Sequence, residues 1–377
     1  MPGEPGGAPW ADPARLEQAA LAILGGRVAE REIAARAGYG TWRAFAAAFT
    51  ATFQVRPADL RGWARAGRYP LGYGGPFHVA QTLRYLGRDP ENLAERVKGT
   101  RYRRHYPLAG GMALVTLRFR AEGCTVEAAR PRAAADAWAL HRLLRRSLGL
   151  DQPLADFYRH AGEHAPLRAL TRQFAGVRIP QLPSLWEALC WAVVGQQINL
   201  AFAYRLRNRL IALGNGLSAP PYPPLPAPAG DAAGLPTEPL PFPKPEQVLR
   251  LTAGTLLAHQ FSRQKAAYLL GLARACAEGT LDEAVLARLP AEEAEARLLA
   301  QRGLGPWSAA YVLMRGLGHP DALPVGDTGL RTALQLAFRL RHPPDARRQV
   351  ALMEPFRPYR SLTTYYLWKS LGSAPGG

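Results

Sequence analysis

The spacing of apolar residues changes twice along the chain. Over residues 14–63 it follows the period of an α-helix, and Phe45, Phe49 and Phe53 fall on one face. The pattern predicts three short helices, over residues 16–24, 30–37 and 41–53. Because the turn at residues 38–40 is so short, the last two helices are typical of a helix-turn-helix unit.

Residues 68–132 have a different pattern. Apolar and polar residues alternate over 113–120 and again over 124–127, and both segments are rich in residues that favour strands. An amphipathic helix is expected before them, over residues 77–86. The region therefore predicts a small α+β subdomain with an antiparallel sheet.

From residue 133 onwards the helical period returns. It covers 186–213 and resumes from 245 to 371, whereas residues 219–245 contain 11 prolines and predict a loop. We therefore expect a mainly α protein with one small α+β domain. Its expected parts are a disordered tail (1–13), a helix-turn-helix-like segment (14–67), the sheet subdomain (68–132) and a helical domain (133–377) with a Pro-rich loop (215–245).

Charge indicates a polyanionic partner. The 377 residues carry a formal net charge of +18, and the isoelectric point is about 10.4. The three cysteines, Cys124, Cys190 and Cys276, lie far apart, which argues against a zinc site or iron–sulfur cluster built on cysteines. We expect no cofactor and no resident metal. No apolar run is long enough to cross a membrane, and the N-terminal residues lack a signal-peptide core, so a cytoplasmic protein is expected.

The most informative stretch for chemistry is residues 298–327. It contains Gly303-Leu304-Gly305 between two expected helices, with Pro306 opening the second. Backbone N–H groups of such a hairpin, together with a helix N-terminus, form an anion site that suits a DNA phosphate. A glycine pair between helices more commonly serves only as a helix cap, so the hairpin alone is a weak signal.

Asp327 follows the hairpin by one helix and one loop, and it precedes a helical run over residues 328–341. Its ordinary role is an N-cap that accepts backbone N–H bonds. That role is compatible with catalysis, because a fixed carboxylate stabilises positive charge that develops on a sugar.

Aromatic residues cluster on two of the expected helices. Trp307 and Tyr311 are spaced i, i+4 on one of them, and Tyr365 and Trp368 lie on the last helix. Core packing explains such residues in most proteins. Alternatively, their rings offer π-faces that hold a flipped base, and a cationic base more strongly than a neutral one.

Residues 298–327 resemble the helix-hairpin-helix superfamily of DNA glycosylases. The chain is similar in particular to the DNA-3-methyladenine glycosylase II family. Residues 184–210 resemble its helix and minor-groove wedge loop, residues 321–331 its catalytic segment, residues 357–368 its C-terminal pocket helix, and residues 68–132 its N-terminal sheet domain. The resemblance covers residues 68–371.

The resemblance implies a role for each matching residue. Asp327 would be the catalytic carboxylate. The base pocket would be lined by Trp307, Tyr311, Tyr365 and Trp368. Contacts to DNA would come from Gln196, Gln197, Arg302, Gly303, Leu304 and Gly305. A monovalent cation would bind carbonyls of Leu299, Gln301 and Leu304. Some relatives that cut the strand carry a nucleophilic lysine where Trp307 stands here, so the resemblance implies a monofunctional enzyme.

Two positions depart from the family pattern. The hairpin usually begins Leu-Pro-Gly, whereas this chain has Gln301-Arg302-Gly303, and the loss of proline loosens the turn. Some members wedge a leucine into the gap left by the flipped base, and Gln197 holds that place here.

The family implies excision of alkylated purines, such as 3-methyladenine or 7-methylguanine, from double-stranded DNA by a monomer acting at the bacterial nucleoid. Two alternatives stay open: excision of a neutral lesion such as hypoxanthine, and a DNA-binding regulator with a decayed glycosylase domain. The first helices resemble a helix-turn-helix of AraC-type regulators. However, positions that are usually basic on the recognition helix are Ala47, Thr50 and Ala51.

Overall fold

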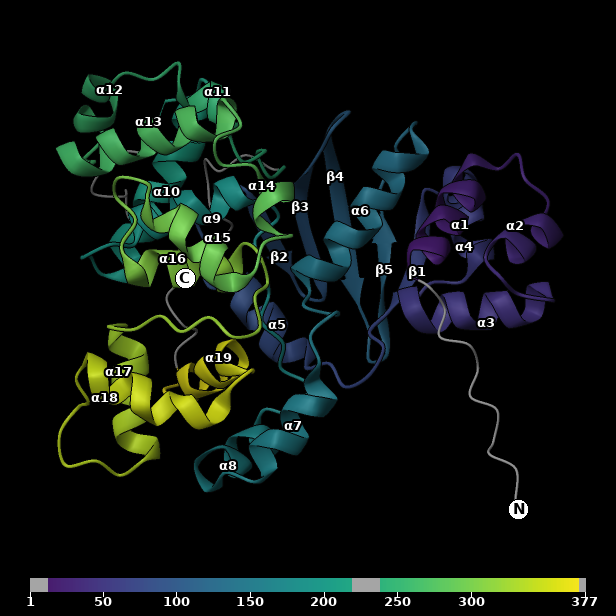
Figure 1. Cartoon of the computed structure of the whole chain (residues 1–377). Coiled ribbons are helices and arrows are strands. Elements are labelled where there is room, and N and C mark those ends of the chain that lie inside the picture. Colours follow the sequence, from purple (N-terminus) through teal and green to yellow (C-terminus); the bar gives the residue numbers. More distant parts are fainter. Residues whose placement is uncertain (1–12, 219–237, 373–377) are drawn as a thin grey trace.

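A computed structural model describes residues 13–218 and 238–372. The expected tail and most of the Pro-rich loop lie outside these residues. Figure 1 shows an antiparallel sheet between the N-terminal helices and a larger helical region. The fold is mainly α with a small sheet, as the sequence predicts.

Four helices form the N-terminal part: α1 (Pro13–Gly25), α2 (Glu30–Arg36), α3 (Trp42–Phe53) and α4 (Pro57–Ala66). The three expected helices are present, and α4 is one more than the sequence analysis predicted. The spacing of Phe45, Phe49 and Phe53 places all three in the core. Phe53 packs edge-on against Trp138, with ring centroids 4.7 Å apart, so this part shares its core with the next.

The sheet contains β1 (Arg68–Gly72), β2 (Glu95–Lys98), β3 (Arg101–Leu108), β4 (Gly111–Phe119) and β5 (Gly123–Glu127). Its order is β1-β5-β4-β3-β2, and every neighbouring pair is antiparallel. Helix α5 (Val79–Leu86) connects β1 to β2, and α6 (Ala134–Ser147) packs across the sheet (Figure 1). The alternating pattern therefore predicted β4, β5 and their antiparallel pairing, whereas β1, β2 and β3 were not predicted from the sequence.

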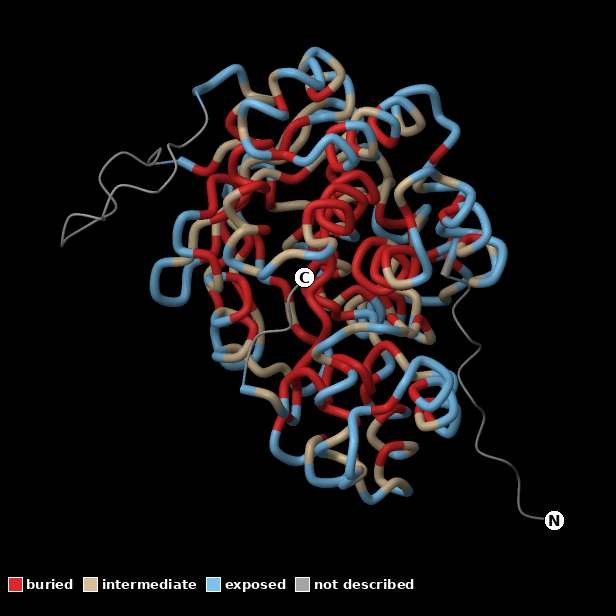
Figure 2. The backbone as a smooth tube through the Cα atoms, turned by 90° about the vertical axis from the view of Figure 1, so that its left-hand side faces the viewer, coloured by how far each residue is buried: buried red, intermediate tan, exposed pale blue. Residues whose placement is uncertain are grey.

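The remaining chain is helical. It contains α7 (Leu154–Gly162), α8 (Ala165–Gln173), α9 (Leu185–Val194), α10 (Leu200–Gly214), α11 (Pro245–Val248), α12 (Ala253–Ala258), α13 (Arg263–Ala277), α14 (Glu283–Leu286), α15 (Ala291–Leu299), α16 (Pro306–Arg315), α17 (Thr328–Ala337), α18 (Ala346–Met353), the 3-10 helix η1 (Glu354–Phe356) and α19 (Arg360–Ser370). Helix α9 is buried along its whole length, and Figure 2 shows such buried segments gathered in the interior.

Two apolar cores are present. One joins the N-terminal helices, the sheet and α6, and the other fills the helical region. Buried charges connect the two. Arg104 of β3 pairs with Glu187 of α9 at 2.8 Å, and Arg207 of α10 pairs with Glu95 of β2 at 3.3 Å. Because all four side chains are at most 7% exposed, removing one partner would leave a buried unpaired charge. Among the described helices, none has the length and apolarity needed to cross a membrane.

Candidate active site

Asp327 lies at the N-terminus of α17. Its backbone is extended, and its Oδ1 accepts a hydrogen bond from the N–H of Leu330 at 2.7 Å. The preceding Gly326 has a φ of +86°, and its N–H donates to Gln349 Oε1 at 3.0 Å. The turn and the cap together fix the direction of the Asp327 side chain, which is half-buried.

Two indoles from different helices hold the same carboxylate. Trp307 of α16 donates from Nε1 to Oδ2 of Asp327 at 3.0 Å, and Trp368 of α19 donates from Nε1 to Oδ1 at 2.8 Å. With the cap, the carboxylate accepts three N–H bonds and makes no ion pair within the described residues. Such donors hold an ionised carboxylate in one orientation without neutralising it.

Gly329 allows the Trp368 indole to lie close to the Asp327 carboxylate. The sequence analysis did not assign this glycine a role. A side chain at position 329 would place its Cβ 3.2 Å from Nε1 of Trp368 and from Oδ1 of Asp327. That spacing is tighter than ordinary van der Waals contact. The glycine therefore leaves room for the indole beside the carboxylate.

The expected hairpin joins α15 to α16. Gly303 has a φ of +98°, and a Cβ there would fall onto the ring of Tyr268 in α13. Gly305 has an ordinary φ of −99°, and a Cβ added to it would meet no atom within 4 Å. Within the described residues, the N–H groups of both glycines have no acceptor. They are therefore free to bind an anion at the start of α16.

The loop after α9 is attached to this hairpin. Gln196 donates from Nε2 to the carbonyl of Gly303 at 2.8 Å and to Ser308 Oγ at 3.0 Å. The next residue, Gln197, is exposed and has a φ of +55°. The structure thus places the expected wedge residue at the surface beside the hairpin, whereas the Gln196 side chain is engaged within the protein.

Lys265 of α13 holds the end of α9 and the following loop by hydrogen bonds. Its ammonium donates to the carbonyls of Val193, Val194 and Gln196, each at 2.8 Å. Burial lowers the pKa of Lys265 to about 8. The sequence analysis did not assign it a role. Its rarity could have singled it out, because Lys265 is one of only four lysines among the 47 lysine and arginine residues of the chain.

The predicted pocket aromatics divide into two groups. Trp307 stacks on Tyr311, with ring centroids 5.5 Å apart and an angle of 22° between the planes, so this pair lies beside Asp327. Tyr365 packs edge-on against Tyr85 of α5 instead, with ring centroids 6.2 Å apart, and it is not among the three described residues that donate to the Asp327 carboxylate. Burial raises the pKa of Tyr311 and Tyr365 far above the usual range, which keeps both phenols neutral.

The other predicted DNA contacts differ in exposure. Arg302 is exposed on the hairpin. Leu304 is only 6% exposed and belongs to the helical core, so its side chain is not available to a ligand. Its N–H donates to the carbonyl of Gln301 at 3.1 Å. That bond engages one carbonyl expected to bind a cation, and cation binding stays a prediction.

Comparisons with known proteins identify the family of the chain. Residues 190–358 match the family described as HhH-GPD superfamily base excision DNA repair protein, and residues 68–184 match the AlkA N-terminal domain. The chain is 35% identical over 223 residues to the DNA-3-methyladenine glycosylase of Bacillus subtilis, which covers 59% of this chain and 69% of the relative.

The name of a second relative combines two functions. The chain is 33% identical over 227 residues to the probable bifunctional transcriptional activator/DNA repair enzyme AlkA of Mycobacterium tuberculosis, covering 60% of this chain and 42% of that protein. Among solved structures, the 3-methyladenine DNA glycosylase from Archaeoglobus fulgidus superposes with a TM-score of 0.67 at 23% identity, covering 80% of this chain and 97% of that one. That likeness concerns the fold.

Proposed function

The chain belongs to the DNA-3-methyladenine glycosylase II family of helix-hairpin-helix DNA glycosylases, and we propose that Asp327 is the residue with which it releases alkylated purines from duplex DNA. The protein is a DNA glycosylase that acts in base excision repair. The observation that carries the proposal for the site is the pair of indole N–H bonds to the Asp327 carboxylate. They leave a fixed negative charge beside two aromatic rings.

DNA binding uses the hairpin. The N–H groups of Gly303 and Gly305 receive a phosphate, and exposed Arg302 adds a cation. Gln197 fills the gap that the flipped nucleotide leaves in the duplex, and phosphate contacts offset the unstacking cost of a few kcal/mol. The protein acts on one lesion at a time as a monomer.

Excision then breaks one bond. The bond between the sugar C1′ and the base nitrogen cleaves, and its electron pair stays on the base, which leaves as a neutral molecule because alkylation had made it cationic. Positive charge moves to the sugar, where the Asp327 carboxylate stabilises it. Water adds to C1′ and loses a proton, which completes hydrolysis and leaves an abasic site.

Strand cleavage by an amine is not part of the reaction. Lys265 is bound to three carbonyls, and Lys369 donates to Gln81 Oε1 at 3.1 Å. Lys98 and Lys244 are exposed on β2 and before α11. Trp307 occupies the place beside Asp327, so no lysine is positioned to form a Schiff base.

Product analysis tests the proposal. The protein is incubated with DNA methylated by dimethyl sulfate, and the released bases are identified by chromatography. We expect free 3-methyladenine and 7-methylguanine and no adduct trapped by borohydride. Release of hypoxanthine from an inosine-containing duplex, without release of methylated purines, would instead establish a neutral-lesion enzyme.

A further inference from the structure

A cluster of possible metal ligands lies at the junction of α7 and α8. His160 is in the last turn of α7, Glu163 follows its end, and His164 precedes the first residue of α8. The sequence analysis expected no resident metal, because it considered only the three separated cysteines as possible ligands. The segment reads His-x-x-Glu-His, which places all three side chains around one break between helices.

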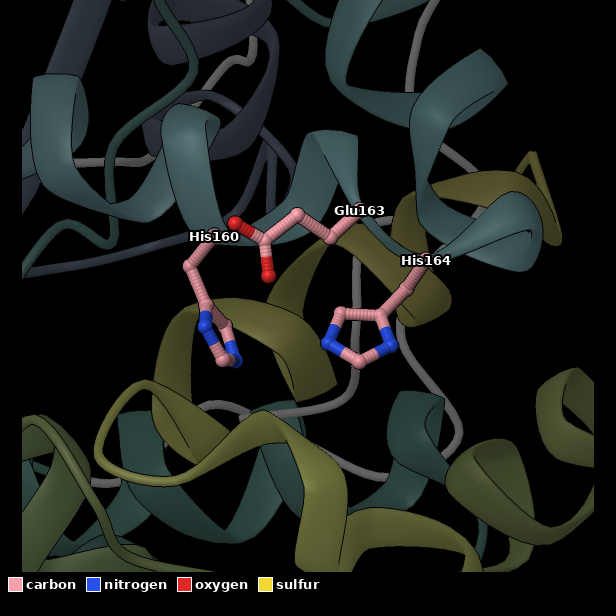
Figure 3. Close-up of side chains that lie close together, drawn as sticks. All are labelled: His160, Glu163 and His164. Atoms are coloured by element: carbon pink, nitrogen blue, oxygen red, sulfur yellow. The ribbon is translucent and has the colours of Figure 1, made fainter.

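The three side chains converge. One ligand atom of each lies within 4.8 Å of the others. Figure 3 shows the Glu163 carboxylate between the two imidazole rings. Bonds of about 2.0–2.2 Å to a common ion bring such atoms somewhat closer together. The exposed Glu163 side chain is free to make that small adjustment, since no ion pair or hydrogen bond holds it within the described residues.

His160 is oriented as a ligand. Its Nε2 lies 2.9 Å from the carbonyl oxygen of Pro355 in η1. A carbonyl only accepts, so Nε2 carries the proton and donates it. The lone pair is then on Nδ1. Imidazoles that bind metals commonly donate their other N–H to a backbone carbonyl in this way.

His164 presents a second imidazole, which is half-buried beside His160. The ring packs edge-on against Phe356 at 4.8 Å, and its centroid is 5.0 Å from that of His160. The apolar ring limits the directions from which water reaches this side of the cluster.

We propose that His160, Glu163 and His164 bind a divalent transition-metal ion of the zinc class, with water as the fourth ligand. Two imidazole nitrogens and one carboxylate oxygen suit zinc, whereas magnesium and calcium prefer all-oxygen sites. Both His160 and His164 also contact η1, which leads into α19 and Trp368. The bound ion therefore stabilises the packing of α7 and α8 against this segment and takes no part in bond cleavage.

The test is a metal titration of the full chain without an affinity tag. Chelator-treated protein is titrated with zinc chloride by competition with a chromogenic chelator. We expect one equivalent to bind with a dissociation constant in the micromolar range or below, and cobalt(II) to give the visible absorption of a four-coordinate ion. Zinc should also raise the melting temperature by about 3 °C.

Variants locate the site. Glu163→Gln and His164→Ala should each weaken zinc binding by at least tenfold, whereas His342→Ala, which alters an exposed histidine elsewhere, should not change it. All three proteins should excise methylated purines as wild type does. Absence of saturable binding, or equal binding by wild type and His164→Ala, would overturn the proposal. Because the titration contains no DNA, its outcome is independent of the proposed excision reaction.

Discussion

The sequence predicted two units of two helices joined by a glycine turn, and of these described units only one borders the proposed active site. Helices α2 and α3 are joined through Gly38, with a φ of +86°, and α15 and α16 through Gly303, with a φ of +98°. In α3 one face, with Phe45, Phe49 and Phe53, is buried, whereas α16 is buried on all sides from Ser308 to Arg315. Helical spacing and one left-handed glycine are therefore sufficient to form such a unit, whatever its use.

The difference lies on the outer surface. Ala47, Thr50 and Ala51 line a shallow groove of about 650 Å³ beside α3, and none of them offers a charge to a phosphate or a polar group suited to bidentate contact with a base. Within the described residues, the α15–α16 hairpin instead has N–H groups without an acceptor, its Gly303 carbonyl binds Gln196 of the loop after α9, and Trp307 of α16 binds Asp327. Function therefore follows from what surrounds the turn, and the regulator alternative finds little support on α3.

The hairpin glycines should give the largest contrast. Gly303→Ala forces a side chain onto the Tyr268 ring at positive φ, so we expect a loss of about 3 kcal/mol in unfolding free energy and at least tenfold weaker DNA binding. Gly38→Ala in the other unit should cost about 1 kcal/mol and leave DNA affinity unchanged. Urea denaturation and fluorescence anisotropy measure both.

Gly305→Ala distinguishes an effect on protein stability from an effect on the approach of a DNA phosphate. Its Cβ meets open space at an ordinary φ, so stability should stay within about 0.5 kcal/mol of wild type. If this variant unfolds as readily as Gly303→Ala, the hairpin does not have the described geometry. A loss of DNA affinity without a loss of stability would indicate that a phosphate approaches this residue closely.

Removing one indole N–H should have the next largest effect. Trp368→Phe keeps an aromatic ring but loses the 2.8 Å bond to Asp327, and bonds to charged groups contribute about 1.5–3 kcal/mol. We expect single-turnover excision to slow by roughly 10- to 100-fold. Trp138→Phe is the control, because Trp138 is equally buried in the other core and its Nε1 has no partner. Equal slowing of both variants would refute a specific role of the indole.

Lys265→Met should slow excision about tenfold, because three carbonyls at the end of α9 lose their donor and the loop that presents Gln197 loosens. Kinetics on a methylated oligonucleotide measure this effect. An unchanged rate would show that the loop after α9 does not need the hydrogen bonds of Lys265 for excision.

The same residue predicts a pH dependence. Burial holds the pKa of Lys265 at about 8 in the folded protein, below the ordinary lysine value of 10.5. Between these values the unfolded chain binds more protons at Lys265, so its contribution to stability rises with pH from about 8 to 10.5 and is smallest below pH 8. The stability of wild type relative to Lys265→Met should therefore increase by about 1–2 kcal/mol over this interval. A constant difference in urea denaturation would contradict the assignment.

The smallest effect is expected on α3. Ala47→Glu and Thr50→Glu introduce negative charge where a recognition helix would meet DNA. We expect excision and DNA affinity to change by less than about twofold, whereas Arg302→Glu on the hairpin should weaken binding clearly. A large loss in the α3 variants would restore a DNA-binding role for the N-terminal unit.

The sequence predicted features that depend on local spacing. The phenylalanine spacing of α3, the alternation in β4 and the position of Asp327 as the N-cap of α17 were all readable along the chain. Long-range contacts were not. The two indoles that meet at Asp327 lie 20 and 41 residues from it in sequence, so only the packing of α16 and α19 brings them together.

Two aromatics of α19 were predicted to line the base pocket, and the structure gives them different partners, so the role of Tyr365 stays a prediction. Tyr365 and Trp368 are spaced i, i+3, about 60° apart around α19, so this spacing is compatible with one pocket, and their different contacts depend on what packs against each side chain. The structure directs Trp368 to Asp327 and Tyr365 to Tyr85. The carbonyls that Lys265 binds lie 69–72 residues away in sequence, which explains why its role was missed.

The most direct test of the central claim is the single-turnover rate of 7-methylguanine release by Asp327→Asn, measured together with its affinity for the same duplex. The substitution keeps the size of the side chain and removes its charge. We predict a rate at least about 100-fold below wild type, with DNA affinity within about threefold. Excision within tenfold of the wild-type rate would contradict the assignment of Asp327 as the catalytic carboxylate.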